Sequence, residues 1–303
     1  MTLRVLEAFG IRIEAQTAAQ AGGAAQTNRA PQATSPPNGA AQASGTAQAD
    51  GASGAAQTSG AENQPHAAAA IEGDPPAAAI LGGQPGAAYT AFRIAGNQRY
   101  TPAASAIEGD WSNAAFWFAA GALSGYAGTG GAVSCTGLDP LSAQGDRAVL
   151  PILRAFGAAT QQHSVAASLG KLRGIEVDAA NIPDLIPILA VVASVSAGTT
   201  RIINAERLRL KESDRLRTTA DCLNALGADV RELPGGLIIT GRERLKGGTV
   251  SGCNDHRIVM AMAIAATCCE APVTIEGMEA INKSYPRFFD DFKKLGGDVR
   301  VCR

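Results

Sequence analysis

The sequence predicts an α/β fold built from three copies of one unit. Aromatic residues make up only 5% of the chain, while alanine and its 35 glycines are plentiful, which favours small-residue α/β packing over a β-sandwich. Three acidic residues each come just before a stretch of small and apolar residues that is typical of a helix. They are Asp110, Asp184 and Asp255, and they are 74 and 71 residues apart. Three glycines that each end a later helix are 70 and 69 residues apart: Gly157, Gly227 and Gly296. Since both spacings recur, we expect one repeated unit.

Each unit is expected to alternate helices and strands in the same order. The first helices lie in EGDWSNAAFWFAAGALSG, IPDLIPILAVVASVSAG and CNDHRIVMAMAIAATCC, and the next strands in GAVSCTGL, TTRIINAE and PVTIEGM. The second helices start near SAQGDRAV, KESDRLRT and KSYPRFFD, before a strand such as ADVREL and the hairpin LPGGLIITG. Three such units around one axis would make a compact α/β domain over residues 106–303.

The residues before position 106 do not follow this repeat. Leu3, Leu6 and Phe9 recur at helical spacing, and the pattern ends at Gly10 before the strand-like piece 11–13. Residues 15–88 are almost entirely Ala, Gln, Gly, Ser, Thr, Pro and Asn, so we expect disorder, because they cannot bury enough apolar surface. The sequence FRIAGNQRYTP then indicates a strand, a turn and an extended piece. An insertion within one domain is favoured, and a linker between two domains is the alternative.

The overall composition excludes several classes of protein. The formal net charge is -1, with 26 basic and 27 acidic residues, so we expect neither nucleic acid nor membrane as a partner. The N-terminal residues lack the apolar region of a signal peptide, and no apolar run is long enough to span a bilayer. The six cysteines form no CxxC pair and have no histidines at metal-ligand spacing, so we expect reduced thiols and no metal site. Any anion binding must therefore be local.

Three charged clusters fall at helix starts instead of along exposed helix faces. They are Lys211–Arg215, Asn254–Arg257 and Asn282–Pro286. Each alone would be an ordinary helix start, capped by Ser213, Asp214 or Asp255, or begun by a proline. Helix N-termini also carry unpaired N–H groups and partial positive charge. Several N-termini that converge would therefore form a site for a ligand with more than one negative charge.

Together these motifs resemble the EPSP synthase family, the enolpyruvyl transferases that act on shikimate 3-phosphate. The resemblance runs through N-I-P-D, K-E-S-D-R-L, D-H-R and K-S-Y-P-x-F-F, and also through IEGDWSNAAFW, SAQGDR and the opening T-L-R-x-L-x-x-F-G. It implies that residues 106–303 are the family's C-terminal domain, an inside-out α/β barrel of three βαβαββ-type units. It also implies that residues 1–14 and 89–105 are a remnant of the second, N-terminal domain.

The resemblance implies a reaction and roles for particular residues. Family members transfer the enolpyruvyl group of phosphoenolpyruvate to the 5-hydroxyl of shikimate 3-phosphate and release phosphate, in the shikimate pathway to chorismate and aromatic amino acids. Arg215 and Arg257 match the arginines that hold phosphoenolpyruvate, because the guanidinium fork suits carboxylate and phosphate. Lys283 matches the lysine that neutralises the departing phosphate. The reaction needs fixed cations, acids and bases, so no cofactor is expected.

The remaining site residues follow from the same resemblance. Glu212 matches the residue assigned to proton transfer at C3 of phosphoenolpyruvate, and Asp184 matches the carboxylate that takes the hydroxyl proton. Lys211 matches a lysine that contacts the shikimate hydroxyl, and its charge would also keep Glu212 ionised. His256 is expected to support the phosphate-binding shell.

The motifs of the family's N-terminal half have no counterpart in this sequence. That half carries a lysine, serines, an arginine and a glycine-rich loop that bind the two substrates. Three hypotheses stay open: one piece of a transferase that works with a separate N-terminal half, a non-catalytic remnant that binds phosphorylated ligands weakly, and a UDP-sugar enolpyruvyl transferase, which K-E-S-D-R disfavours. An exposed apolar face on residues 3–9 would favour a missing partner. The complete enzyme is expected to be a cytoplasmic monomer.

Overall fold

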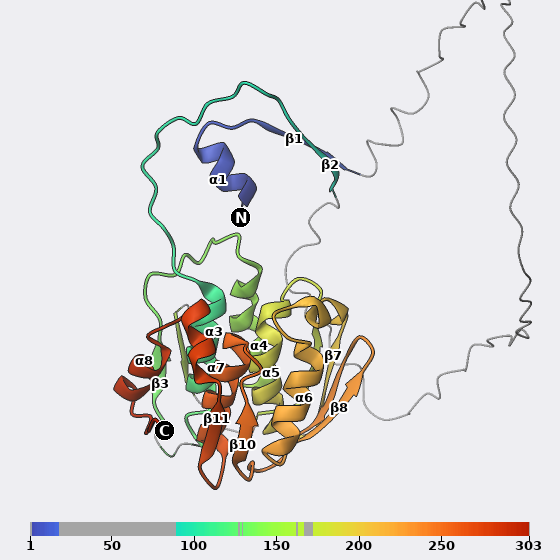
Figure 1. The fold of residues 1–303 in the computed structure, drawn as a ribbon, viewed down its shortest axis with the longest axis vertical. Coiled ribbons are helices and arrows are strands. Elements are labelled where there is room, and N and C mark those ends of the chain that lie inside the picture. Colours follow the sequence, from blue (N-terminus) through green and yellow to red (C-terminus); the bar gives the residue numbers. More distant parts are fainter. Residues whose placement is uncertain are drawn as a thin grey trace, which may run out of the picture.

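The computed structural model shows a small N-terminal unit and a larger α/β domain (Figure 1). The larger domain holds every element from residue 111 onward. The predicted disordered segment lies, from residue 18 to its end at 88, outside the described part of the chain. The residues that the structure describes are 2–17, 89–126, 128, 130–161, 163–166 and 172–302.

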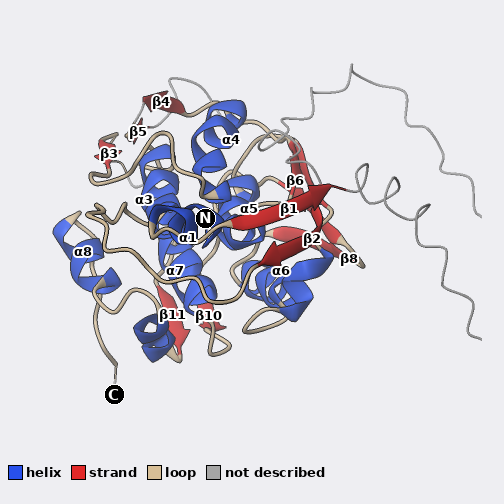
Figure 2. Cartoon of the chain, turned by 90° about the horizontal axis from the view of Figure 1, so that it is seen from above, coloured by secondary structure: helices blue, strands red, loops and turns tan. Residues whose placement is uncertain are grey.

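Three helices lie at the centre of the α/β domain and contact one another: α3 (Trp111–Ala122), α5 (Ile186–Ser194) and α7 (His256–Ala265). Seen from above, these helices lie in the middle and the sheets lie toward the periphery (Figure 2). A second helix follows each of them in the chain: α4 (Val149–Phe156), α6 (Arg215–Ala225) and α8 (Phe288–Lys294). The order of helices therefore agrees with the order predicted from the sequence.

Three sheets surround the helices. The first is antiparallel, in the order β3 (Ala132–Ser134), β5 (Ser164–Ala166), β4 (Ala159–Gln161). The second has the order β6 (Glu176–Asp178), β7 (Thr199–Ile203), β9 (Gly236–Thr240), β8 (Asp229–Leu233). Within it β6 and β7 are parallel and the other pairs are antiparallel, and β8 and β9 form the predicted hairpin. The third pairs β10 (Gly248–Ser251) and β11 (Val273–Glu276) in parallel.

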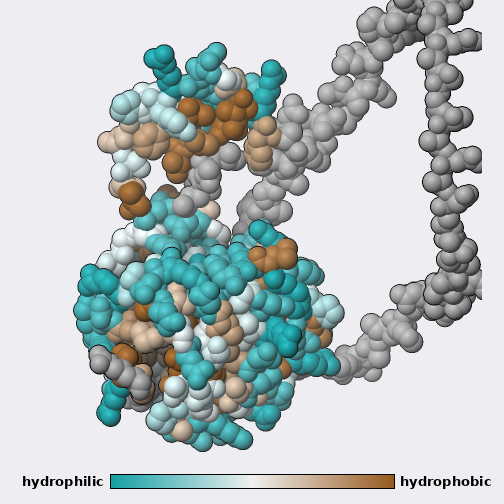
Figure 3. All heavy atoms as spheres, viewed as in Figure 1, coloured by the Kyte–Doolittle hydropathy of each residue, from teal (hydrophilic) through white to brown (hydrophobic). Residues whose placement is uncertain are grey.

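The N-terminal unit consists of α1 (Thr2–Ala8) and an antiparallel pair, β1 (Ile13–Thr17) and β2 (Tyr89–Ile94). The helix ends at Ala8, and Gly10, which was predicted to end it, follows in the turn with a φ of +80° that favours glycine. The strand runs through residues 15–17, so the predicted start of disorder at residue 15 is wrong. Pairing with β2 provides hydrogen-bond partners for the backbone N–H and C=O groups of this strand. Apolar side chains gather on one face of this unit (Figure 3), and those that are about half exposed are Val5, Phe92 and Ile94.

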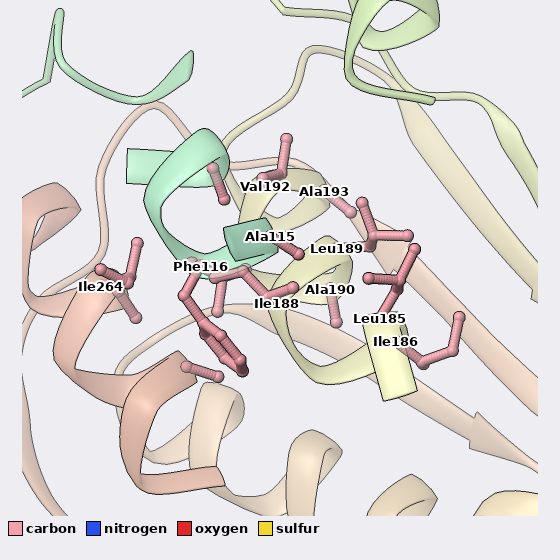
Figure 4. Close-up of a cluster of buried hydrophobic side chains, with 14 of the residues drawn as sticks. Ala115, Phe116, Leu185, Ile186, Ile188, Leu189, Ala190, Val192, Ala193 and Ile264 are labelled. Atoms are coloured by element: carbon pink, nitrogen blue, oxygen red, sulfur yellow. The ribbon is translucent and has the colours of Figure 1, made fainter. Parts of the chain in front are cut away.

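Beyond the polar residues of their first turns, the central helices are apolar on nearly every side, which suits burial. Every residue of α5 and α7 is buried, as are most residues of α3. An amphipathic surface helix would instead carry a polar face. Figure 4 shows Phe116 of α3, Ile188 of α5 and Ile264 of α7 pointing into one cluster. The core thus fixes the relative positions of the three helices, and with them the positions of the residues at their N-termini.

The ends of the helices fit most of the sequence signals. The three glycines that were predicted to end helices lie directly after or close to helix ends, and all have positive φ: Gly157, Gly227 and Gly296. Asp110 and Asp255 cap α3 and α7, whereas Asp184 lies in a 3-10 turn, η3 (Pro183–Leu185), directly before α5. The helix predicted to start near KSYPRFFD begins inside that stretch, at Phe288. Pro286 was expected in its first turn but lies before it, because η6 (Met278–Lys283) precedes the proline and Pro286 disfavours helical backbone at the residue before it.

The thiols are poorly reactive where they are buried. All six cysteines are free, and burial raises the pKa of Cys222 and of Cys268 to about 12. At neutral pH these two groups are therefore thiols, which are weak nucleophiles compared with thiolates. Within the described residues, no helix is both long and apolar enough to cross a membrane.

Candidate active site

The predicted site residues gather where three elements begin. Asp184 comes from η3, residues 211–215 lead from η4 (Glu206–Leu210) into α6, and residues 255–257 start α7. Asp214 caps α6 by accepting a hydrogen bond from the N–H of Arg217 at 3.2 Å, and Asp255 caps α7 from the N–H of Arg257 at 2.9 Å. The capping interpretation of each motif is therefore right, and the caps also bring the charged neighbours together.

Arg215 is the hub of the cluster, with a side chain that is only 1% exposed. Its Nε and Nη2 donate to Asp255 at 2.7 and 3.1 Å, its Nη1 donates to Asp184 at 2.7 Å, and its Nη2 donates to Glu212 at 2.6 Å. Burial works to lower the pKa of Arg215, but the hydrogen bond and charge of Asp255 outweigh burial and raise it. Four of the five N–H groups are thus committed to carboxylates, which leaves one for a ligand.

Three positively charged side chains lie close to Asp184. Its Oδ1 lies 2.7 Å from Arg215 Nη1, 3.1 Å from Lys211 Nζ and 3.6 Å from Arg257 Nε, and the side chain is 30% exposed. Partial burial works to raise the pKa of Asp184, but Arg257, Lys211 and Arg215 together lower it. Asp184 is therefore an ionised, partly accessible carboxylate. Lys211 forms its ion pair with this residue, and no ion pair joins it to Glu212 among the described residues.

Asp255 holds Arg215 in place from the opposite side. Its carboxylate is fully buried, and it also accepts a hydrogen bond from Ser213 Oγ at 3.0 Å. Burial works to raise its pKa, but the hydrogen bond and charge of Arg215 lower it. The sequence marked Asp255 only as a helix cap. Its pairing with a residue 40 positions earlier depends on how α6 and α7 pack, which no local pattern shows.

His256 and Arg257 carry buried polar atoms without partners. Neither His256 Nδ1 nor Arg257 Nη1 has a hydrogen-bond partner within the described structure. Burial and then the charge of Arg257 lower the pKa of His256, so its imidazole is neutral at pH 7, and the 4.0 Å approach to Asp255 is not an ion pair. An unpaired buried donor is costly unless a ligand satisfies it. Arg257 Nη1 is therefore the cluster's best available donor to an anion.

Lys283 stands slightly apart from the other six residues. Its Nζ donates to the backbone oxygen of Asn254 at 2.5 Å and to the Oδ1 of the same residue at 2.7 Å. Asn254 has a φ of +52° and directly precedes Asp255. The lysine is exposed, and the start of α7 holds it beside the cluster, without an ion pair to any of the other predicted residues.

Asp146 is a buried carboxylate near the cluster that the sequence did not single out. It lies in η2 (Gly145–Ala148), within SAQGDR, and accepts a hydrogen bond from Ser112 Oγ of α3. Burial raises the pKa of Asp146, the hydrogen bond from Ser112 opposes this effect, and the charge of Asp184 adds to it. The motif SAQGDR was the available signal, but nothing in it assigns this aspartate a role.

The arrangement suits a polyanionic ligand that also exchanges protons. Three cations meet three carboxylates, and two of these carboxylates, Asp184 and Glu212, are 30% and 40% exposed. A ligand can therefore reach them, while a buried guanidinium fixes their orientation. Among the described residues, no group of three or more His, Cys, Asp and Glu side chains is arranged to hold a metal ion.

Comparison with known proteins gives consistent results. The family model described as EPSP synthase (3-phosphoshikimate 1-carboxyvinyltransferase) matches residues 84–292. A 3-phosphoshikimate 1-carboxyvinyltransferase of Clostridium acetobutylicum is 51% identical over 212 residues, which cover 70% of this chain and 48% of that protein. The protein of the same name from Methanocorpusculum labreanum is 40% identical over 211 residues, covering 69% and 49%.

The solved structure of an EPSP synthase from Acinetobacter baumannii is also similar. It has a TM-score of 0.57 and 26% sequence identity, and the match covers 70% of this chain and 51% of that one. The chain spans about half the length of the curated relatives it matches. The similarity therefore concerns one half of those proteins.

Proposed function

Since the chain belongs to the EPSP synthase family, we propose that it supplies half of the active site for enolpyruvyl transfer from phosphoenolpyruvate to the 5-hydroxyl of shikimate 3-phosphate, with release of phosphate. The observation that carries the proposal is the connected cluster of Asp184, Lys211, Glu212, Arg215 and Arg257. Because the chain spans about half of its relatives, the proposed activity also requires residues that correspond to their other half.

Two carboxylates do the proton chemistry in this proposal. Asp184 takes the proton of the attacking hydroxyl, since three cations keep it ionised and part of it is exposed. Lys211, 3.1 Å from Asp184, orients the same hydroxyl. Glu212 moves a proton to and from C3 of phosphoenolpyruvate, and its 2.6 Å bond to Arg215 Nη2 fixes the carboxylate for that task. No metal or organic cofactor takes part in these steps.

The anionic groups of the substrates are held by cations at the helix starts. Arg257 offers Nη1, and the neutral imidazole of His256 offers a hydrogen bond from its ring. Lys283 neutralises the departing phosphate by leaving Asn254, which it contacts only through neutral oxygen atoms. Arg215 has one N–H left for phosphoenolpyruvate and, in this arrangement, chiefly orients Asp184 and Glu212.

The fold on which this site rests is, in our proposal, an inside-out α/β barrel of three units. Each unit supplies one central helix, one outer helix and one sheet, and the second unit has the full order of elements, from β6 to β9. Residues 106–303 would form this domain, and residues 1–14 with 89–105 would belong to a second domain. The half-exposed Val5 and Ile94 support a partner for that second part.

The proposed partners are phosphoenolpyruvate, shikimate 3-phosphate and a separate N-terminal half. The complete enzyme, with both halves, would be a monomer. The second candidate function is a non-catalytic remnant that binds phosphorylated ligands weakly. Arg257 Nη1 favours this candidate too, because an unpaired buried donor binds an anion whether or not catalysis follows.

Product analysis separates the two functions. The chain, alone and mixed with the N-terminal half of the Clostridium acetobutylicum relative, is incubated with both substrates, and the enolpyruvyl ether is detected by mass spectrometry. We expect product only in the mixture. Absence of product from a mixture in which both polypeptides bind both substrates would establish the remnant and reject the transferase.

A further inference from the structure

Two cysteine side chains meet at one backbone oxygen close to the candidate site. Cys222 lies in α6, and Cys253 lies in the turn that joins β10 to α7. Both thiols donate to the backbone oxygen of Ser251, Cys222 Sγ at 3.3 Å and Cys253 Sγ at 3.6 Å. Because α6 packs against β10, the two sulfur atoms come from different elements and share one acceptor.

The turn that carries Cys253 is held tightly by its neighbours. The N–H of Gly252 donates to the backbone oxygen of Glu276 in β11 at 2.7 Å, and the N–H of Asp255 donates to that of Gly252 at 2.8 Å. A Cβ added at Gly252 would lie 2.5 Å from Cγ2 of Val259 in α7. Cys253 has a φ of +49°, which is uncommon for a residue with a side chain. The surrounding structure therefore fixes where the Cys253 thiol lies.

The two thiols differ in how accessible they are. Cys222 is 5% exposed, whereas Cys253 is only partly buried. Burial, followed by the charge of Cys253, raises the pKa of Cys222 to about 12, and a hydrogen bond with Cys253 adds to this effect. The direct influence of one thiol on the other confirms that the two sulfur atoms are neighbours. An oxidant from solution would therefore reach Cys253 first, and Cys222 would react second, with the sulfur beside it.

We propose that Cys222 and Cys253 are a dithiol site that a small-molecule disulfide, such as oxidised glutathione, converts into an intramolecular disulfide. In the first step the thiolate of Cys253 attacks one sulfur of the small disulfide, which gives a mixed disulfide and releases one small thiol. In the second step the thiolate of Cys222 attacks the Cys253 sulfur and releases the other small thiol. The protein loses two protons and two electrons, and the small disulfide gains both.

The disulfide would join the two helices whose N-terminal ends carry the central ion pair. Arg215 begins α6 and pairs at 2.7 Å with Asp255, the cap of α7. Cys253 comes two residues before Asp255 and directly before Asn254, which holds Lys283. A covalent bond at this point adds to the ion pair and hydrogen bonds that already join α6 to the start of α7. Oxidation therefore clamps the start of α7 to α6 and hinders the opening of the candidate site.

Peptide mapping tests the pair. The chain with Cys302→Ser, which removes an exposed thiol, is incubated with oxidised glutathione under native conditions, alkylated and digested. We expect one dominant disulfide, between Cys222 and Cys253, that dithiothreitol reverses. The matched control is Cys222→Ser, because serine can still donate to Ser251 but cannot form the bridge, and this variant should keep glutathione on Cys253. Absence of the bridge, or bridges spread equally over the other cysteines, would overturn the proposal.

Thermal unfolding tests whether the two thiols already lie in bridging positions. A disulfide that closes a loop of about 30 residues stabilises mainly by restricting the unfolded chain. We therefore expect the Tm of the oxidised chain to be at least about 5 °C above that of the reduced chain, with no rise for Cys222→Ser after the same treatment. An unchanged or lower Tm would show that the backbone must move to form the bridge, which contradicts the described positions of Cys222 and Cys253.

Hydrogen exchange tests the clamp on the candidate site. The amides of Arg257 and Val259 bond to the side chain and the backbone of Asp255, so they report on opening at the start of α7. Both should exchange at least about tenfold more slowly in the oxidised chain, whereas the amides of the short strand β3 should change less. Equal changes in the two places, or no slowing at Arg257 and Val259, would refute the clamp. The chain alone suffices for all three measurements, so their outcome is independent of the proposed transferase activity.

Discussion

At the scale of single residues, one buried arginine organises the site. Arg215 donates four hydrogen bonds to carboxylates from three different segments, and each contact has a cause that the structure makes plain: a cap at the start of α7, a turn before α5, and the loop before α6. A buried charge is tolerated only when it is paired and hydrogen-bonded. Two predictions belong to this scale.

Removing the charge of Asp255 should destabilise the domain strongly. Asp255→Asn leaves the guanidinium of Arg215 buried with weaker compensation, and breaking a buried pair typically costs about 3–5 kcal/mol. Urea unfolding measures the effect. The matched control is Asp229→Asn, which breaks the half-exposed pair with Arg242 and should cost less than about 1 kcal/mol. Similar losses in the two variants would show that Asp255 does not hold Arg215 as described.

Protonation of His256 should make stability fall below neutral pH. Burial lowers the folded-state pKa below the ordinary 6.5, so the unfolded chain binds the proton more readily. The free energy of unfolding should be highest above that value and decrease as pH falls from about 7.5 to about 5.5. Asp184 and Asp255 have lowered pKa values and add their own loss only at pH below about 4. His256→Gln should flatten the slope between pH 7.5 and 5.5, and an unchanged slope would assign it to another group.

At the scale of elements, the central helices carry the site because they pack very closely on their surroundings. α3 passes so near to β5 that a Cβ added at Gly121 would lie 2.3 Å from the backbone oxygen of Val165. The position of α3 in turn fixes Ser112, which holds Asp146 near Asp184. Packing at one glycine is thus linked to the polar residues at the start of the helix.

Gly121→Ala should therefore destabilise the protein although alanine is the better helix former. Overpacking against backbone typically costs about 1–3 kcal/mol, more than the roughly 1 kcal/mol that alanine gains over glycine in a helix. Gly131→Ala is the control, because no atom lies within 4 Å of a Cβ at that position. Chemical unfolding of both variants gives the comparison. If Gly121→Ala is as stable as the parent chain, α3 and β5 are farther apart than the structure places them.

Much of the element order could be predicted from the sequence, for physical reasons. The three central helices consist mainly of small and apolar residues and have no polar face along their length, which is typical of a buried helix. The glycines at the ends of α4, α6 and α8 adopt positive φ, which glycine tolerates best. Pro286 was expected in the first turn of α8 but lies before it, because a 3-10 turn and a helix start look alike in sequence. The pairing of Arg215 with Asp184 and Asp255 could not be predicted from local patterns, since it spans 31 and 40 residues and requires the packed core.

At the scale of the whole molecule, the site is open. Asp184 and Glu212 are partly exposed, and the donor of Arg257 has no partner among the described groups. The chain corresponds to about half of its relatives, so in the proposed function residues of the other half would cover the second face of a substrate. Water exclusion by that second face is what would make the paired charges effective in catalysis.

The most direct test of the proposed function is the rate of phosphate release from phosphoenolpyruvate and shikimate 3-phosphate. The chain is mixed with the N-terminal half of the Clostridium acetobutylicum relative, and Glu212→Gln is compared with the exposed control Glu243→Gln. Proton transfer by a positioned carboxylate typically contributes 10²–10⁴-fold, so Glu212→Gln should lose at least about 100-fold while the control keeps the parent rate. Equal rates for the two variants, or release that does not require the added half, would contradict the proposed role of this cluster.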